Sequence, residues 1–146
     1  MKIYVASSWR TFKHRPVVEA LRAAGHDVYD YRQQGFSWNA LGIAREPHSL
    51  EAMYSAVYME TCTERFVEDM AQLDAADAVV LVLPSNRSAH LELGYAVGRH
   101  KVTGVVWDAT EPELMYRMVD FIVDNLTDLV KSLTIHVPPW TVSHRE

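Results

Sequence analysis

Two acidic side chains have the type and the setting to take part in a reaction at a sugar carbon. Glu92 in "HLELGYAVG" lies near the start of a predicted helix that follows a strongly apolar stretch. A carboxylate there can attack an anomeric carbon if a second proton-handling group is close, as in retaining glycoside chemistry. Asp69 in "FVEDMAQLDAAD" is the candidate for that second group. Asp74 and Asp77 compete with it, although both lie near enough to the next strand to act as turn and cap residues.

Two other roles are open to Glu92. A carboxylate in the first turn of a helix is stabilised by the helix dipole by about 0.3–1 kcal/mol, whatever else it does. His90 and Glu92 also form the H-x-E pattern of zinc deaminases, but the partner P-C-x-x-C cannot occur in a chain whose only cysteine is Cys62. There is no H-E-x-x-H pair either, so we expect no metal and no cofactor. Cys62, within a helix of apolar spacing, is expected to be a small core residue.

The loop after the first predicted strand offers donors for an anion. Ser7, Ser8, Trp9 and Arg10 follow "KIYVA" and precede a helix. Hydroxyls, backbone N–H groups and a guanidinium at that position suit a phosphate or a sugar. The G-x-G-x-x-G fingerprint and the P-loop lysine are both missing, which excludes those two nucleotide sites. A capped and solvated helix start explains the same residues equally well.

Four aromatic residues stand where they could stack on a nucleobase. Phe36 and Trp38 lie in the long polar connection over residues 32–47, and Tyr4 and Trp9 lie near the end of the first strand. Core or lid packing is the alternative for each of them. The polar neighbours of Trp38 favour a binding role for that residue.

The elements that must position these residues alternate along the chain. Apolar runs predict strands over residues 2–7, 26–31, 77–84, 102–107 and 118–124. Helical spacing predicts helices over residues 16–25, over roughly 49–75 with a break near Cys62, in the stretch that carries Glu92, and over 126–133, with a short helix at 111–116. Such alternation predicts a single-domain α/β fold: a doubly wound, flavodoxin- or Rossmann-like, mostly parallel five-stranded sheet over residues 1–133, with a tail over 134–146. Ligands bind such sheets at the carboxyl ends of the strands.

Composition narrows the class of partner. A chain of 146 residues with a net charge of −5 and no run of Lys and Arg is expected to bind a small molecule rather than a nucleic-acid polymer. No apolar run approaches the roughly 20 residues that span a bilayer, so we expect no membrane partner. A single cysteine is consistent with a reducing compartment, and we predict a cytoplasmic protein.

The segments "KIYVASSWR", "DMAQLDAADAVVLVLP" and "HLELGYAVGRHK" together resemble the nucleoside 2-deoxyribosyltransferase superfamily, which includes 2'-deoxynucleoside 5'-monophosphate N-hydrolases. The resemblance covers most of residues 2–130 in order, and E-L-G-Y-A is its most specific part. It implies that Glu92 is the nucleophile at C1' of the sugar. It also implies that Asp69, eight residues before Asp77, assists catalysis.

The resemblance also implies a set of substrate contacts. In the hydrolase branch a Tyr-x-x-x-Ser-x-Arg arrangement holds sugar and phosphate, and Tyr4, Ser8 and Arg10 stand at those positions. A serine in the loop before the nucleophile contacts the phosphate there, a role open here to three residues: Ser85, Asn86 and Ser88. The family habit also implies a homodimer or a larger homo-oligomer.

One departure from the family pattern bears on the type of reaction. The family usually has a glycine, often with an aspartate upstream, before the nucleophile, whereas this chain has "NRSAHLE". This departure weakens the transferase interpretation more than the hydrolase one. We therefore predict cleavage of the N-glycosidic bond of a (deoxy)nucleoside 5'-monophosphate or nucleoside, with base exchange and a non-catalytic nucleotide-binding module as the alternatives.

Overall fold

The computed structural model describes residues 1–43 and 49–135. Its centre is a five-stranded sheet in the order β2-β1-β3-β4-β5, and every pairing is parallel. The strands are β1 (Lys2–Ser7), β2 (Asp27–Tyr29), β3 (Ala78–Val82), β4 (Val102–Val106) and β5 (Phe121–Val123). This topology confirms the predicted doubly wound α/β fold. The strand order reverses between β1 and β3, so the crevice that a ligand would use opens there.

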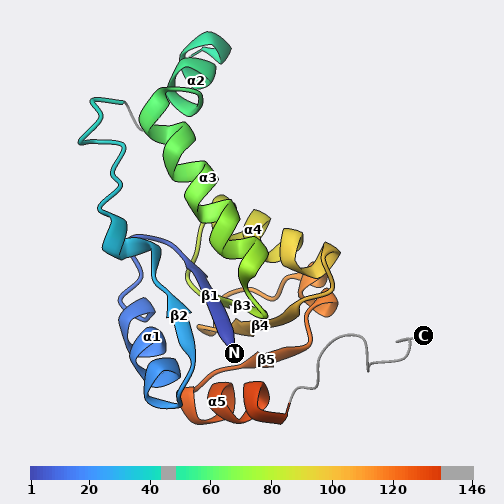
Figure 1. The fold of residues 1–146 in the computed structure, drawn as a ribbon. Helices are drawn as coiled ribbons and strands as arrows, with labels where there is room; N and C mark the ends of the chain where they lie inside the picture. Colours follow the sequence, from blue (N-terminus) through green and yellow to red (C-terminus); the bar gives the residue numbers. More distant parts are fainter. Residues whose placement is uncertain (44–48, 136–146) are drawn as a thin grey trace.

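Helices cover both faces of the sheet (Figure 1). Helices α1 (His14–Ala23) and α5 (Leu126–Ile135) pack on one face, where Val17, Leu21 and Leu129 join a core with the strands. Helices α3 (Glu60–Ala75) and α4 (Arg87–Gly98) pack on the other face through Leu73 and Leu93. Because both faces are covered, β3 is buried along its whole length, as its continuous apolar sequence predicts.

Local sequence sets the ends of several elements. Helix α1 ends at Ala23, and Gly25 terminates it with a φ of +89°, which suits a residue without a Cβ. The N–H of Gly25 donates to the carbonyl of Arg22 and that of His26 to the carbonyl of Leu21, which is the Schellman arrangement. In β4, a Cβ at Gly104 would overlap the ring of Phe121 on β5, so glycine is needed for that strand pairing.

The helical region before β3 differs from the prediction. It forms two helices, α2 (Leu50–Val57) and α3, and the break lies at Tyr58 and Met59 rather than near Cys62. Met59 has extended backbone angles, whereas Cys62 lies inside α3 and is buried. Residues 50–67, which we call the arm, stand away from the sheet (Figure 1).

The smaller elements also refine the prediction. β2 is shorter than residues 26–31, because Asp30 caps a 3₁₀ helix, η1 (Tyr31–Gln34), by accepting a hydrogen bond from the N–H of Arg32. The predicted short helix is a 3₁₀ helix, η2 (Leu114–Met118), and the predicted fifth strand is present as β5. Helix α5 continues to Ile135, and most of the predicted tail, residues 136–146, lies outside the described residues. Within the described ranges, no helix is both long and apolar enough to cross a bilayer.

Candidate active site

Glu92 lies on α4 above the carboxyl ends of the central strands. It is the sixth residue of that helix, more than one turn beyond its start at Arg87. The helix dipole acts mainly within the first turn, so the interpretation of Glu92 as a first-turn carboxylate is wrong. The prediction failed because α4 begins at Arg87, directly after Asn86, and so includes five residues before Glu92.

The carboxylate of Glu92 meets the side chain of Tyr4 from β1. The Tyr4 hydroxyl donates a hydrogen bond of 3.0 Å to Oε1 of Glu92. The pKa of Glu92 is raised to about 7, mainly by burial. The bond from Tyr4 opposes this rise, and the charge of Asp69 adds to it. Burial, followed by the charges of Glu92 and Asp69, raises the pKa of Tyr4, so this hydroxyl keeps its proton. Glu92 therefore has a fixed orientation and can change its charge near neutral pH.

Asp69 on α3 is held in a similar way by Tyr29, the last residue of β2. The Tyr29 hydroxyl donates a hydrogen bond of 2.8 Å to Oδ1 of Asp69. The rings of Tyr4 and Tyr29 stack with their centroids 5.4 Å apart, which links the two tyrosine–carboxylate pairs. Burial raises the pKa of Asp69 and the bond from Tyr29 lowers it. Two carboxylates of raised proton affinity thus lie on neighbouring tyrosines at one edge of the sheet.

The two competing aspartates lie elsewhere. Asp74 accepts a hydrogen bond of 2.5 Å from the hydroxyl of Tyr95, and both groups are exposed. Asp77 accepts a bond of 2.7 Å from the N–H of Lys2 at the amino end of β1. Both bonds lie at the amino edge of the sheet. Of the three aspartates, Asp69 is the one whose charge acts on Glu92.

The β1–α1 loop, residues 8–13, follows β1 at the same edge as Glu92. The hydroxyl of Ser8 accepts a hydrogen bond of 3.3 Å from the N–H of Arg10. The side chain of Arg10 is exposed and forms no ion pair or hydrogen bond within the described ranges. Trp9 packs edge to face on Tyr31, so its ring is part of the loop's packing. The exposed Arg10 is free to meet an anion.

The loop between β3 and α4 carries the three remaining candidates for phosphate contact. Ser85 has a buried hydroxyl with no hydrogen-bond partner in the described parts of the chain. Asn86 precedes α4 without a side-chain capping bond, and Ser88 is exposed on the first turn. A buried hydroxyl without a partner carries a desolvation cost that a bound ligand can relieve, and this favours Ser85 among the three.

His90, the bulky residue of the departure from the family pattern, packs on η2. Its Nε2 lies 2.8 Å from the hydroxyl of Tyr116, and the two rings stack with centroids 5.8 Å apart. Its Nδ1 lies 2.8 Å from the carbonyl oxygen of Asn86. His90 thus connects the start of α4 to η2, and these contacts indicate a structural role.

The predicted base-stacking residues form a contact of their own. Phe36 and Trp38 pack edge to face with centroids 5.1 Å apart, and Trp38 is 39% exposed. Neither ring shares a hydrogen bond or ring contact with Glu92 or Asp69 in residues 1–43 and 49–135. Their part in binding stays a prediction.

No metal centre can be built from the described residues, which contain no group of three or more His, Cys, Asp and Glu side chains suited to one. Cys62 is buried, and burial raises the pKa of its thiol. A thiol with a raised pKa is a poor nucleophile at neutral pH. Cys62 is therefore not a candidate nucleophile.

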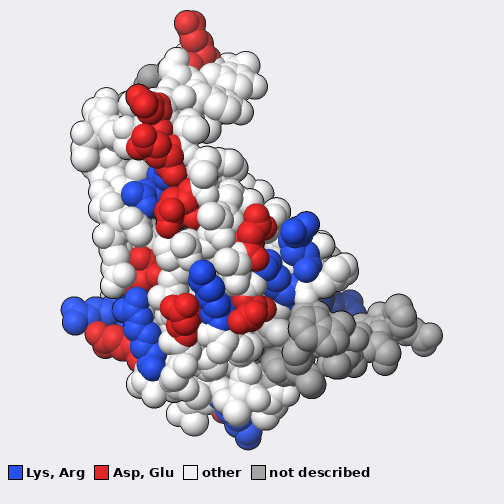
Figure 2. All heavy atoms as spheres, in the orientation of Figure 1, with Lys and Arg blue, Asp and Glu red and all other residues white. Residues whose placement is uncertain are grey.

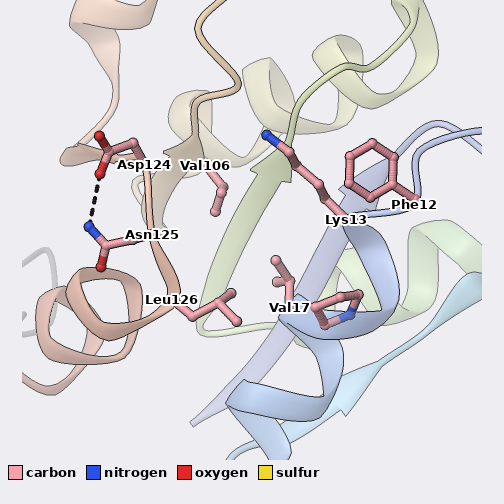
Figure 3. A pocket seen from close by; sticks show the side chains of 8 residues that line it. Phe12, Lys13, Val17, Val106, Asp124, Asn125 and Leu126 are labelled. Carbon is pink, nitrogen blue, oxygen red and sulfur yellow. Dashed lines mark hydrogen bonds between the residues drawn. The ribbon is translucent and has the colours of Figure 1, made fainter.

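A cavity of about 210 Å³ lies on the opposite face of the sheet from Glu92, between α1 and α5 (Figure 3). Its walls include Val17, Val106 and Leu126, and Lys13 and Asp124 lie at its rim. It is smaller than the roughly 300–1,000 Å³ of ordinary ligand sites and holds none of the predicted site residues. The paired carboxylates Glu92 and Asp69 therefore remain the candidate site.

Sequence reasoning missed Tyr29 as a member of the site. The available signal was its place at the end of a strand in "HDVYDY", because the ends of parallel strands face the ligand edge. Its partner Asp69 stands 40 residues away in the sequence, and no local pattern connects the two.

Comparison with known proteins supports the architecture. No family model matches the sequence, and no curated protein matches it. Among solved structures, the 2-deoxyribosyltransferase of Bacillus psychrosaccharolyticus aligns with a TM-score of 0.65 at 20% identity, over 95% of this chain and 98% of that one. The CMP N-glycosidase BcmB of Clostridium botulinum aligns with a TM-score of 0.50 at 14% identity, over 92% and 100% of the two chains. The predicted resemblance is confirmed at the level of the fold.

Proposed function

We propose that this protein is an enzyme that cleaves the N-glycosidic bond of a nucleoside or its 5'-monophosphate, with Glu92 as the nucleophile. The observation that carries the proposal is the pair of partly buried carboxylates, Glu92 and Asp69, each bonded to a tyrosine of one stacked pair. Retaining glycosidases use two carboxyl groups, one as nucleophile and one as acid and base. The folds of a deoxyribosyltransferase and an N-glycosidase add support.

The reaction has two steps. In the first, the ionised carboxylate of Glu92 attacks C1' through an oxocarbenium-like transition state, and the C1'–N bond breaks as an ester forms. Asp69 takes up a proton from solvent water and passes it to the departing base. In the second step water attacks C1', Asp69 takes a proton from that water, and the sugar leaves Glu92. The raised pKa of Asp69 suits a group that gives and takes a proton.

The substrate contacts follow from the same proposal. Arg10 and Ser8 hold the 5' end, and Ser85 adds a hydroxyl from the other side of the crevice. Trp38 or Phe36 stacks on the base. Tyr4 was expected to hold the substrate, and its bond to Glu92 gives it the further role of orienting the nucleophile.

The test is a chromatographic assay of free base released from ribo- and deoxyribonucleosides and their 5'-monophosphates. Glu92→Gln is expected to lower turnover by at least about 10³-fold, because the amide cannot form the ester. Glu19→Gln is the matched control, since Glu19 is exposed on α1, on the other face of the sheet, and is expected to leave turnover unchanged. A Glu92→Gln enzyme with full activity would refute the proposal. Binding of nucleotide without turnover in the wild type would support a non-catalytic module instead.

Base exchange is the second candidate, because one of the aligned structures is a 2-deoxyribosyltransferase. In that reaction a second base, rather than water, attacks C1' of the ester on Glu92. Addition of a different free base to the assay separates the two, since only exchange yields a new nucleoside.

We also propose a homo-oligomer that forms through the arm. Its helices expose large apolar side chains, including Tyr58 at 70% and Phe66 at 63%, while the acidic residues Glu60, Glu64 and Glu68 recur every four residues on α3 (Figure 2). Large apolar side chains exposed together suit an interaction site, and two copies related by a two-fold axis can cover them for each other. Light scattering of the purified protein tests this, and Phe66→Asp is expected to shift it to the monomer mass. A wild-type monomer would contradict the proposal.

A cytoplasmic location stays a prediction.

A further inference from the structure

The segment that follows β2 fastens the β1–α1 loop from one side. The Nη2 of Arg32 donates hydrogen bonds of 2.6 Å to the carbonyl oxygen of Ser8 and 2.8 Å to that of Thr11. One guanidinium thus joins two points of the loop that lie three residues apart. Because Arg32 and the loop are more than twenty residues apart in the sequence, this contact fixes the loop through the tertiary fold.

Two neighbouring side chains complete the fastening. The Tyr31 hydroxyl donates a bond of 2.7 Å to the carbonyl oxygen of Ser7. The buried ring of His14 lies between Ser7 and Asp30, with Nδ1 2.6 Å from the Ser7 hydroxyl and Nε2 2.7 Å from Oδ1 of Asp30. An ionised Asp30 only accepts, so Nε2 carries the proton and Nδ1 accepts from Ser7.

This Ser–His–Asp connection is not a nucleophilic triad. Ser7 is only 7% exposed, and its hydroxyl lies between His14 and the Tyr31 hydroxyl, 3.1 Å away. A nucleophile must reach its substrate, and this serine faces the interior. The group therefore serves to hold the end of β1 where the loop begins.

The bonds from Arg32 determine where the loop's own donors point. In a planar trans peptide the N–H is directed opposite to the carbonyl. With the carbonyls of Ser8 and Thr11 turned toward Arg32, the N–H groups of Trp9 and Phe12 are turned away from it. No acceptor for either N–H is found among the described residues. The Thr11 hydroxyl is also buried and without a partner in the same ranges.

The charge of Arg32 is not neutralised by a neighbour. The ion pairs found among the described residues are His14–Asp30 and Arg15–Glu19, and neither involves its guanidinium. The chain carries a net charge of −5, so an anion needs local positive charge to bind. The half-buried guanidinium of Arg32, beneath a loop with unpaired N–H groups, supplies it.

We infer that Arg32 is a positioning residue that makes the site selective for substrates with a 5'-phosphate. It shapes the β1–α1 loop so that backbone N–H groups and the exposed Arg10 meet the phosphate, and it adds positive charge from below. This inference rests on the proposed function, because it concerns the same crevice. It predicts a loss of phosphate recognition rather than a loss of the chemical step.

The experiment measures kcat and KM for a panel of nucleoside 5'-monophosphates and for the matching nucleosides. The variants are Arg32→Met, Arg32→Lys and Arg22→Met. Arg22 is a matched control because its guanidinium also donates to a backbone carbonyl, that of Val28 at 3.1 Å, but at the other end of α1. Calorimetry of each variant with the same ligands and with inorganic phosphate gives binding independently of turnover.

Arg32→Met is expected to raise KM for the monophosphates at least about tenfold and to change the values for nucleosides by less than about twofold. Arg32→Lys keeps the charge and is expected to restore part of the loss, and Arg22→Met is expected to behave as the wild type. An equal loss for both substrate classes would mean a merely structural role and would overturn the inference. So would unchanged selectivity, or a wild type that binds monophosphates no better than nucleosides.

Failure of the proposed function gives a different pattern. If the wild type releases no base but binds monophosphates, and Arg32→Met abolishes that binding, the inference stands and the N-glycosidase proposal falls. If base is released with unchanged phosphate selectivity in Arg32→Met, the inference falls and the N-glycosidase proposal stands.

Discussion

Helix α3 carries two aspartates, each bonded to a tyrosine of another element, and the two pairs differ in their surroundings. Asp69 accepts from Tyr29 at 2.8 Å toward the carboxyl edge of the sheet, and Asp74 accepts from Tyr95 at 2.5 Å toward the amino edge. Burial is the main cause of the raised pKa of Tyr29, whereas the bond to Asp74 is the main cause for Tyr95. The same two residue types thus form a desolvated pair and a solvated one. What separates them is burial and the nearby carboxylate of Glu92.

The largest expected difference between the two pairs is in turnover. Asp69→Asn is expected to lower kcat by about 10²–10⁴-fold, because the amide cannot exchange a proton with the base or the water. Asp74→Asn is expected to change kcat by less than about twofold, since that carboxylate is exposed and lies at the other edge. Steady-state assays of base release measure both. Equal losses of kcat in Asp69→Asn and Asp74→Asn would contradict a specific role of Asp69 in turnover.

The buried carboxylate is expected to lower stability at high pH. Burial raises the pKa of Glu92 from 4.5 to about 7, so the folded state binds this proton more tightly than the unfolded state. The contribution of this proton to the free energy of unfolding is fully present below about pH 4.5. It is lost as pH rises through about 7, by up to about 3 kcal/mol. Glu92→Gln should therefore be more stable than the wild type at pH 8 and similar to it at pH 4.5.

Urea unfolding at both pH values measures this difference. The matched change at the amino edge is Asp77→Asn, which removes an exposed carboxylate bonded to the N–H of Lys2. It is expected to give no stabilisation at either pH. The same gain for Glu92→Gln at pH 4.5 and at pH 8 would contradict the assignment of the effect to ionisation.

The pH dependence of the rate tests the bond from Tyr4. The nucleophile must be ionised, so kcat/KM is expected to rise with a midpoint near pH 7. The bond from Tyr4 lowers the pKa of Glu92, and Tyr4→Phe removes it. The midpoint should move to higher pH, with a fall of about tenfold in kcat/KM at pH 7. A midpoint that does not move would mean that Tyr4 does not tune the nucleophile.

The smallest expected effect concerns the tyrosines that hold the aspartates. Tyr29→Phe is expected to lower kcat by about three- to tenfold, because Asp69 keeps its place on α3 but loses one bond worth about 0.5–1.5 kcal/mol. Tyr95→Phe removes the corresponding bond to Asp74 and is expected to leave kcat unchanged. Thermal melts of both variants separate this effect from general destabilisation.

The sequence predicted the sheet well because its central strands are buried on both faces. A strand such as β3, "AVVLV", must be apolar throughout, and this pattern can be recognised from the strand's own residues. The break between α2 and α3 was misplaced because it depends on the backbone of Met59, with no Pro or Gly to mark it. The position of Glu92 within α4 was misjudged for a similar reason, since Asn86 gives no side-chain cap.

Residue type and the family resemblance singled out Glu92, Asp69 and Tyr4, and their roles stay predictions. The sequence did not single out Tyr29, which bonds to Asp69. The bonds from Tyr29 and Arg32 join residues far apart in the sequence, and only the order of the strands brings them together. Long-range contacts of this kind follow from the fold as a whole and have no local pattern.

The continuity of α3 has a consequence for assembly. This helix begins in the arm and ends beside the sheet (Figure 1), and Asp69 is the tenth of its 16 residues. A helix of 16 residues is a stiff rod of about 24 Å. A partner that binds the arm would therefore contact the same rigid helix that holds Asp69 against Tyr29.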